Sequence, residues 1–156
     1  MNITTKEKRV LISGAVVYKR AKNGRTYWFL VKQGEDPVWE IPKVTVRKGE
    51  SSVRASMRMM AESGGMNIRV LEEAGKFGGN VTVNGNVLPK TTLYYLAKHL
   101  GESEVLAFGE NGWFEYANAV KQLEMKSEKD VLKNSVKELK IWRKAKEKAK
   151  KQGIEL

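Results

Sequence analysis

Residues 44–66 read "VTVRKGESSVRASMRMMAESGGM", and this stretch decides the fold. Ser51 or Ser52 can accept hydrogen bonds from the free amides of a first helical turn. Gly64-Gly65 can supply the left-handed conformation that commonly ends a helix. The stretch therefore predicts a loop over residues 44–50, followed by a helix whose beginning and end are both encoded locally.

The two sides of this predicted helix differ in character. At 100° per residue, one side is apolar and is the predicted core face, with Val53, Met57, Met60 and Ala61. Met59, Glu62 and Ser63 project together from the opposite side. We therefore expect Met59 outside the core, beneath a loop that covers it, and we expect the second side to hold any functional groups.

The rest of the chain predicts a mixed α/β fold. Apolar, β-branched runs at 9–20 and 27–33 flank Asn23-Gly24, a hairpin signal, and 39–43 is a short strand that Pro42 ends. The runs 67–83 and 86–100 are longer strands joined at Asn84-Gly85. Because strands precede and follow the helix and further helices come last, we expect helices packed on a mixed sheet.

The C-terminal third is predicted to be mainly helical. Residues 104–108 form a candidate short strand and residues 109–113 a loop, before a helix over 113–123. Ser127 and Asp130 resemble a capping box at the start of a long helix. Its apolar stripe consists of Leu132, Val136, Leu139 and Trp142.

Composition limits the possible chemistry. The 156 residues predict a single domain, with a core over about 8–142 and a basic helix end over 140–156. The absence of cysteine excludes disulfides and thiolate chemistry, and a single histidine leaves little for a histidine metal cluster. No run approaches the roughly 20 apolar residues of a membrane span, so we expect a cytoplasmic protein with no membrane partner. Of the net charge of +11, a local +6 falls between Lys140 and Lys151, which favours an anionic partner for that end.

The stretch at 44–66 resembles the Nudix box, G-x5-E-x7-R-E-U-x-E-E-x-G-U, in which U is aliphatic. Glu50, Arg58, Glu62 and Gly65 match the pattern. Val44, Met59 and Ser63 stand where the first glycine and two glutamates belong. The flanking runs "SGAVVYKR", "VWEIPK" and "GWFEYANAV" are also similar to the family. The resemblance implies a Nudix-like α/β/α sandwich. Within the family, the sequence is most similar to the dinucleoside polyphosphate hydrolases.

The resemblance also implies a chemistry and a set of residues. Nudix enzymes split diphosphates linked to nucleosides with Mg²⁺ or Mn²⁺ held by glutamates of the box helix, and such cations require oxygen ligands. The corresponding catalytic residues here are Glu62 and Glu50, with Glu62, Glu50 and Glu110 as metal ligands. Glu102 and Glu104 are alternative substitutes from the same later loop. Arg58 is expected to orient the box through an ion pair with Glu50, and Gly65 to end it.

Two classes of function follow. Because Met59 is a poor magnesium ligand and Ser63 is uncharged, the preferred interpretation is a degenerate Nudix domain that binds a nucleotide, polyphosphate or RNA without a metal, hydrolysis being lost or much weakened. Its candidate phosphate and nucleotide contacts are Lys43, Arg47, Lys48 and Trp39. The alternative is an active, metal-dependent pyrophosphohydrolase of dinucleoside polyphosphates or nucleoside diphosphate derivatives, with a rewired metal shell.

The basic tail has two interpretations as well. Its cations can simply form a solvated face that complements the helix C-terminus. Alternatively, Arg143, Lys144, Lys146 and Lys148 contact RNA or a ribonucleoprotein, in which case binding depends strongly on salt. A purely structural module within a ribonucleoprotein is the third and weakest hypothesis.

Overall fold

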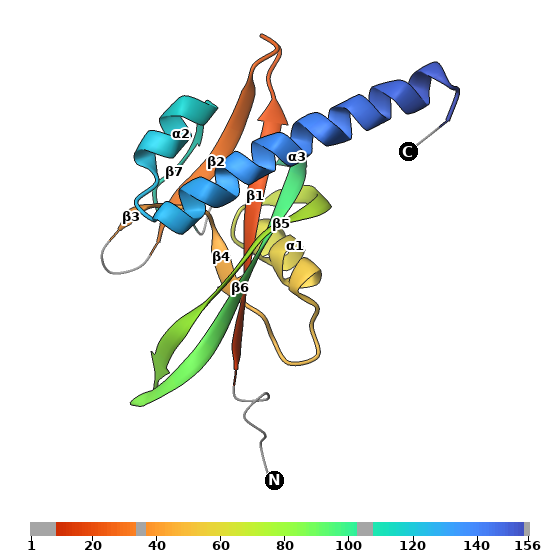
Figure 1. Cartoon of the computed structure of the whole chain (residues 1–156). Helices are drawn as coiled ribbons and strands as arrows, with labels where there is room; N and C mark the ends of the chain where they lie inside the picture. Colours follow the sequence, from red (N-terminus) through yellow and green to blue (C-terminus); the bar gives the residue numbers. More distant parts are fainter. Residues whose placement is uncertain (1–8, 34–36, 103–107, 155–156) are drawn as a thin grey trace.

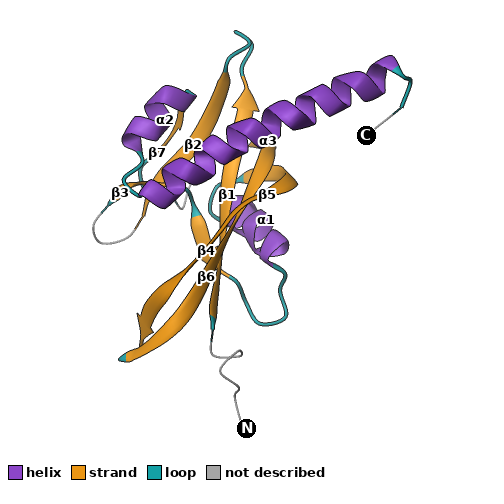
Figure 2. Cartoon of the chain, in the orientation of Figure 1, coloured by secondary structure: helices purple, strands orange, loops and turns teal. Residues whose placement is uncertain are grey.

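A computed structural model describes residues 9–33, 37–102 and 108–154, and it shows a mixed sheet between helices (Figure 1). The strands are β1 (Val10–Arg20), β2 (Thr26–Gln33), β3 (Val38–Glu40), β4 (Lys43–Thr45), β5 (Met66–Val83), β6 (Asn86–Glu102) and β7 (Asn111–Phe114). The helices are α1 (Ser52–Glu62), α2 (Tyr116–Gln122) and α3 (Lys126–Lys151). The mixed α/β class predicted from the sequence is confirmed (Figure 2).

The sheet is built around one parallel pair of strands. Its main order is β3-β2-β1-β6-β5, with β4 added to β1 and β7 added to β2. β1 runs parallel to β6, whereas β5 and β6 form a long antiparallel hairpin. Asn84 and Gly85 both have positive φ, at 51° and 80°, which gives this hairpin the tight turn that their sequence signals.

Alternating residues of β1 separate two hydrophobic cores. Val16 and Tyr18 face a cluster completed by α2 and α3, whereas Ala15 and Val17 face a cluster completed by α1. This period of two is the geometry of a strand with both faces covered. The sheet therefore lies between α1 on one face and α2 with α3 on the other, as in an α/β/α sandwich.

Four local predictions need correction or lie outside the described residues. Residues 44 and 45, predicted as loop, belong to strand β4, and residues 111–114, predicted as the end of a loop and the start of a helix, form strand β7. Both are short edge additions held by pairing with distant strands, so their own residues carry little signal. The cap of α3 is Met125, without a side-chain hydrogen bond, so Ser127 does not begin it. The strand predicted over 104–108 lies almost entirely outside the described residues.

The face that α1 presents to the sheet also differs from the prediction. Ala55, Ser56, Met59 and Met60 are buried, whereas Met57 is 45% exposed. The hydroxyls of Ser13 and Ser56 are 2.6 Å apart and both residues are completely buried. This polar contact lies between α1 and β1, so the buried face of α1 includes Ser56 and differs from the face that the apolar residues alone predict. No helix within the described part of the chain is long and apolar enough to span a membrane.

Candidate functional site

The loop before α1 is fastened to the helix by Glu50 and Arg58. Arg58 Nε lies 2.7 Å from Glu50 Oε2, and Arg58 Nη2 donates to Glu50 Oε1 at 3.0 Å. Arg58 Nη2 also donates to the carbonyl of Thr45, and the amide of Arg47 donates to Glu50 Oε1. The ion pair expected from the family pattern is therefore present, in the bidentate form that arginine favours.

These contacts set the charge state of Glu50. The hydrogen bonds from Arg58 and from the Arg47 amide lower the pKa of the Glu50 carboxyl to about 2. Both of its carboxylate oxygens are occupied by these donors. Glu50 is thus an anion at neutral pH that already has its counter-ion, which leaves it poorly available to a metal.

Met59 lies inside the core and not on the functional side of the helix. Its side chain is 3% exposed and belongs to the cluster that includes Val17, Phe29, Met60 and Phe108. The expectation that Met59 lies outside the core is therefore wrong, because α1 turns this residue toward the sheet. The position that carries a glutamate in the Nudix box is here part of the hydrophobic packing.

The other two carboxylates of the predicted metal site each lie beside a cation, and Glu62 shares Arg58 with Glu50. The side chain of Glu62 is 59% exposed and lies 3.9 Å from Arg58 Nη1. Glu110 is 60% exposed and pairs with Lys32 at 2.8 Å. Ser63 ends α1, and its backbone amide donates to the carbonyls of Met59 and Met60. Gly65, whose φ is +59°, supplies the left-handed stop that the sequence predicts.

Within residues 9–33, 37–102 and 108–154, no group of three or more His, Cys, Asp or Glu side chains is placed to hold a metal ion. Glu104 lies outside these ranges, and the side chain of Glu102 is likewise not described.

The predicted phosphate contacts fall into two groups. Arg47 and Lys48 are exposed on the loop before α1. The ammonium of Lys43 instead lies 2.6 Å from Glu128, 3.1 Å from Glu40 and 2.9 Å from the carbonyl of Ile41. It is committed to contacts within the protein.

Trp39 is also part of the packing. Its ring lies edge-on to that of Phe114, with centroids 4.9 Å apart, and it is a partly buried member of the cluster beneath α3. Lys32 lies over the same ring, 5.1 Å from its centroid. The indole of Trp39 is therefore held by contacts within the protein.

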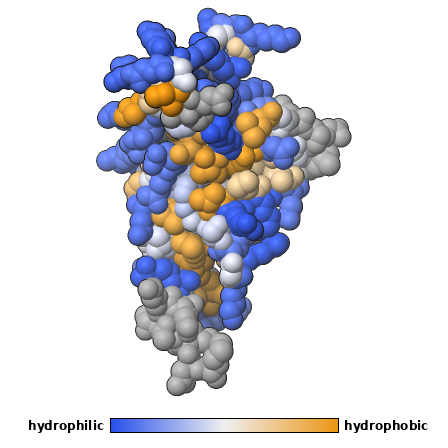
Figure 3. All heavy atoms as spheres, turned by 90° about the vertical axis from the view of Figure 1, so that its right-hand side faces the viewer, coloured by the Kyte–Doolittle hydropathy of each residue, from blue (hydrophilic) through white to orange (hydrophobic). Residues whose placement is uncertain are grey.

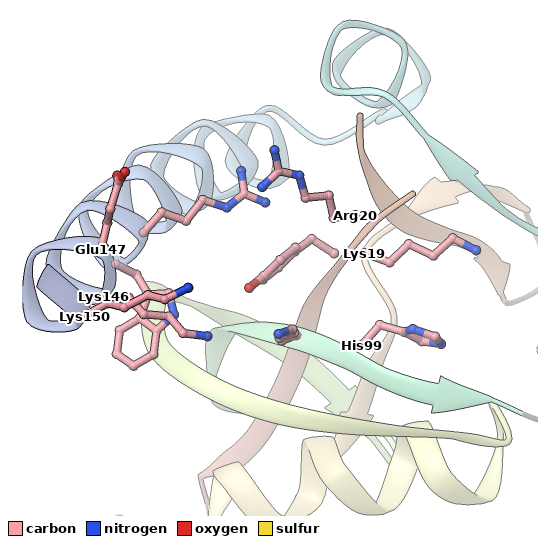
Figure 4. A pocket seen from close by; sticks show the side chains of 10 residues that line it. Lys19, Arg20, His99, Lys146, Glu147 and Lys150 are labelled. Atoms are coloured by element: carbon pink, nitrogen blue, oxygen red, sulfur yellow. The ribbon is translucent and has the colours of Figure 1, made fainter. Parts of the chain in front are cut away.

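The basic tail contributes to a feature that the sequence did not predict. The C-terminal half of α3 extends beyond the sheet (Figure 1), and the upper part of the face toward which it projects is mainly hydrophilic (Figure 3). A cavity of about 930 Å³, the α3 cleft, lies between this half of the helix and the ends of β1 and β6 (Figure 4). Arg143 and Lys146 line it, whereas Lys144 and Lys148 are exposed elsewhere on the helix. Lys19, Arg20 and Lys98 line it from the strands, and no local sequence signal brings them together.

Known proteins are similar to this chain in structure. No protein-family model and no curated protein matches its sequence. Ap4A hydrolase from C. elegans, in a binary complex, is similar at a TM-score of 0.64 with 21% identity, over 83% of this chain and 97% of that one. A NUDIX hydrolase from Nitrosomonas europaea is similar at a TM-score of 0.62 with 14% identity, over 81% and 88%.

A third neighbour is the NUDIX domain of Shewanella oneidensis NrtR, complexed with ADP ribose. It is similar at a TM-score of 0.63 with 17% identity, over 84% of this chain and 88% of that one. The agreement extends over 88–97% of the length of each neighbour. The chain therefore has the fold of the Nudix hydrolases.

Proposed function

We propose that this protein uses the Nudix fold to bind a nucleotide or another ligand with linked phosphates, and that diphosphate hydrolysis is lost or much weakened. The observation that carries the proposal is the burial of Met59 in the core, at the position of a box glutamate. A thioether surrounded by apolar side chains is a poor ligand for Mg²⁺ or Mn²⁺.

The residues present do not fit a catalytic metal site. Nudix hydrolases generally use divalent cations, and such ions require several oxygen ligands. Here Glu50 is held by Arg58, Glu110 is paired with Lys32, and Glu62 is the one box-helix glutamate that remains. A single exposed carboxylate provides too little charge to replace the hydration shell of a divalent ion.

Two observations support a phosphate-bearing ligand. Solved neighbours include a hydrolase named for Ap4A and a NUDIX domain complexed with ADP ribose, and Ap4A and ADP ribose both contain linked phosphates. In this chain, Arg47 and Lys48 are exposed beside α1 and form no ion pair within the described residues. Exposed cations of this kind can bind phosphates without a metal.

An active pyrophosphohydrolase is the second candidate. It is favoured by Glu62, which remains exposed at its box position beside Arg58. This candidate requires further ligands from the segment around Glu104, outside the described residues. It makes a different prediction, because all hydrolysis would then depend on Glu62.

A hydrolysis assay separates the two candidates. Phosphate release from dinucleoside polyphosphates, nucleoside diphosphate sugars and nucleoside triphosphates is measured with Mg²⁺ or Mn²⁺, for the wild type, Glu62→Gln and the control Glu124→Gln. Glu124 is an exposed carboxylate between α2 and α3. We expect little or no release from all three proteins. Release that disappears only in Glu62→Gln would establish the enzyme and overturn the proposal.

A further inference from the structure

The α3 cleft is lined almost entirely by cations and aromatic rings. Its ten lining residues include one acid, Glu147, and six basic side chains: Lys19, Arg20, Lys98, Arg143, Lys146 and Lys150. Figure 4 shows Lys146, Glu147 and Lys150 on α3 and Arg20 on the strand side of the cavity, whereas the side chains of Lys19 and His99 point away from α3. Segments far apart in the sequence thus place five of these cations, all except Lys19, around one partly open cleft.

Within the part of the chain that the structure describes, these cations have no ion pair. Within the described residues, none of the six lies within 4 Å of a carboxylate oxygen, whereas Arg25, Lys32, Lys43 and Arg58 all do. Arg143 lies over the ring of Tyr18, which orients its guanidinium without neutralising it, whereas Lys19 lies over the ring of Trp113, which packs on the α1 side of the sheet. Because like charges repel, a cluster of this kind is costly unless an anion binds to it.

The walls of the cleft are preorganised by the fold. Arg143 Nη2 donates to the hydroxyl of Thr26 at 3.2 Å, which fixes its guanidinium above Tyr18. Burial raises the pKa of the Tyr18 hydroxyl, although Arg143 and Arg69 oppose that effect, so the hydroxyl is neutral and can donate a hydrogen bond. The ring of Trp142 forms a further wall.

We propose that the α3 cleft is a binding site for a chain of linked phosphates, either a free oligophosphate or the phosphate chain of a nucleotide. Its volume of about 930 Å³ lies within the usual range of small-ligand sites, roughly 300–1,000 Å³, so it suits a compact ligand. None of Glu50, Arg58 and Glu62 lines it. The site is therefore separate from the box helix, and the inference does not depend on whether hydrolysis survives.

Calorimetric titration with inorganic tripolyphosphate tests the site. The cleft variant is Lys146→Ala/Lys150→Ala, and the matched control is Lys144→Ala/Lys148→Ala, which removes the same charge from the same turns of α3 outside the cleft. We expect the cleft variant to weaken binding by about tenfold or more, since two short-range charge contacts are lost, and the control to change it by less than about threefold. Unchanged circular dichroism shows that both variants remain folded.

A third variant makes the charge of the α3 cleft more positive and leaves all of its lysines in place. Glu147→Gln removes the one acid that lines the cleft, so tripolyphosphate should bind more tightly to it than to the wild type. Equal weakening by the two double variants would overturn the proposal, because it would mean diffuse attraction to the whole helix. Absence of binding to the wild type would overturn it as well.

The source of the phosphates is distinguished by comparing ligands. Tripolyphosphate, a nucleoside triphosphate, a dinucleoside tetraphosphate and a single-stranded RNA are titrated at the same ionic strength. Tighter binding of the nucleotides than of tripolyphosphate, lost in Trp142→Leu, identifies a nucleotide site, and equal binding identifies a free oligophosphate site. If RNA binds most tightly and loses affinity equally in both double variants, the binding site is a nucleic-acid surface along α3 and not the α3 cleft.

Discussion

The carboxylate of Glu128, completely buried on α3, lies 2.6 Å from the ammonium of Lys43 on β4. The same carboxylate accepts hydrogen bonds from the amide of Ile41 and the hydroxyl of Tyr94, at 2.9 and 2.8 Å. Three segments distant in sequence, around Ile41–Lys43, Tyr94 and Glu128, therefore meet at one buried carboxylate. Its contacts fix α3 against the turn that follows β3, and so set the direction in which the basic end of α3 leaves the sheet.

Replacing Glu128 by glutamine tests this arrangement. Glutamine keeps a hydrogen-bond acceptor but leaves Lys43, whose side chain is 19% exposed, without its closest counter-ion. We expect the free energy of unfolding to fall by about 2–4 kcal/mol, as for other buried pairs that lose one partner. Urea unfolding measures the change, and Glu147→Gln, an exposed position on the same helix, serves as the control. Equal stability of the two variants would contradict a structural role for Glu128.

The close packing of Gly14 against the ring of Tyr94 provides a second test of the fold. A Cβ atom at Gly14 would lie 2.6 Å from Cδ1 of the Tyr94 ring, so alanine there must displace a ring that hydrogen bonds to Glu128. We expect Gly14→Ala to destabilise the fold by about 1–3 kcal/mol, which is typical of overpacking. Gly78→Ala is the matched control, because nothing lies within 4 Å of its Cβ and its φ is not positive. Thermal unfolding of both variants should show a loss only for Gly14.

The pair of Glu50 and Arg58 predicts a dependence of stability on pH. The folded pKa of Glu50, about 2, lies below its ordinary value of 4.5. A depressed pKa contributes stability above the unfolded pKa and loses it as the pH falls through the folded pKa. Wild-type stability should therefore decrease relative to Glu50→Gln between pH 4.5 and pH 2. Urea midpoints across this range measure the difference, and an NMR titration of the Glu50 carboxyl with a midpoint near 4.5 would refute it.

Sequence patterns predicted the elements that are encoded locally. The ends of α1 follow from Ser51, whose hydroxyl accepts the amide of Arg54, and from Gly65. The β5–β6 hairpin follows from Asn84-Gly85 in the same way. Such signals act over a few residues, so a sequence reveals them without knowledge of the fold.

Features that depend on distant partners were not predictable. The buried face of α1 is set by the contact between Ser56 and Ser13, yet a serine within a helix indicates an exposed position. Glu128 likewise looks like any charged residue of a basic helix until Lys43 and Tyr94 are placed beside it. The α3 cleft is of the same kind, because its cations come from two strands and a helix.

The buried position of Met59 gives a prediction that needs no ligand. Met59→Glu would place a carboxylate among Phe29, Met60 and Phe108, and should destabilise the fold by several kcal/mol, about 3 or more. Met57→Glu introduces the same charge on the same helix at a side chain that is 45% exposed, and should have little effect. Urea unfolding without metal compares the two variants. Similar stabilities would mean that Met59 is not part of the core in solution.

A second pair of variants tests whether carboxylates introduced on the box helix are enough to bind a metal ion. Met59→Glu/Ser63→Glu introduces glutamates at the two box positions that lack them, whereas Met57→Glu/Ser63→Glu adds equal charge in a different arrangement. A cation that binds only the folded state raises stability in proportion to the logarithm of its concentration. We expect millimolar Mn²⁺ to raise neither midpoint, because position 59 faces the core whereas Glu62 is exposed. A rise for the Met59 pair alone would contradict this. If neither midpoint rises, the loss of the metal site extends beyond these two side chains, and restoring catalysis would require changes in the loops around α1.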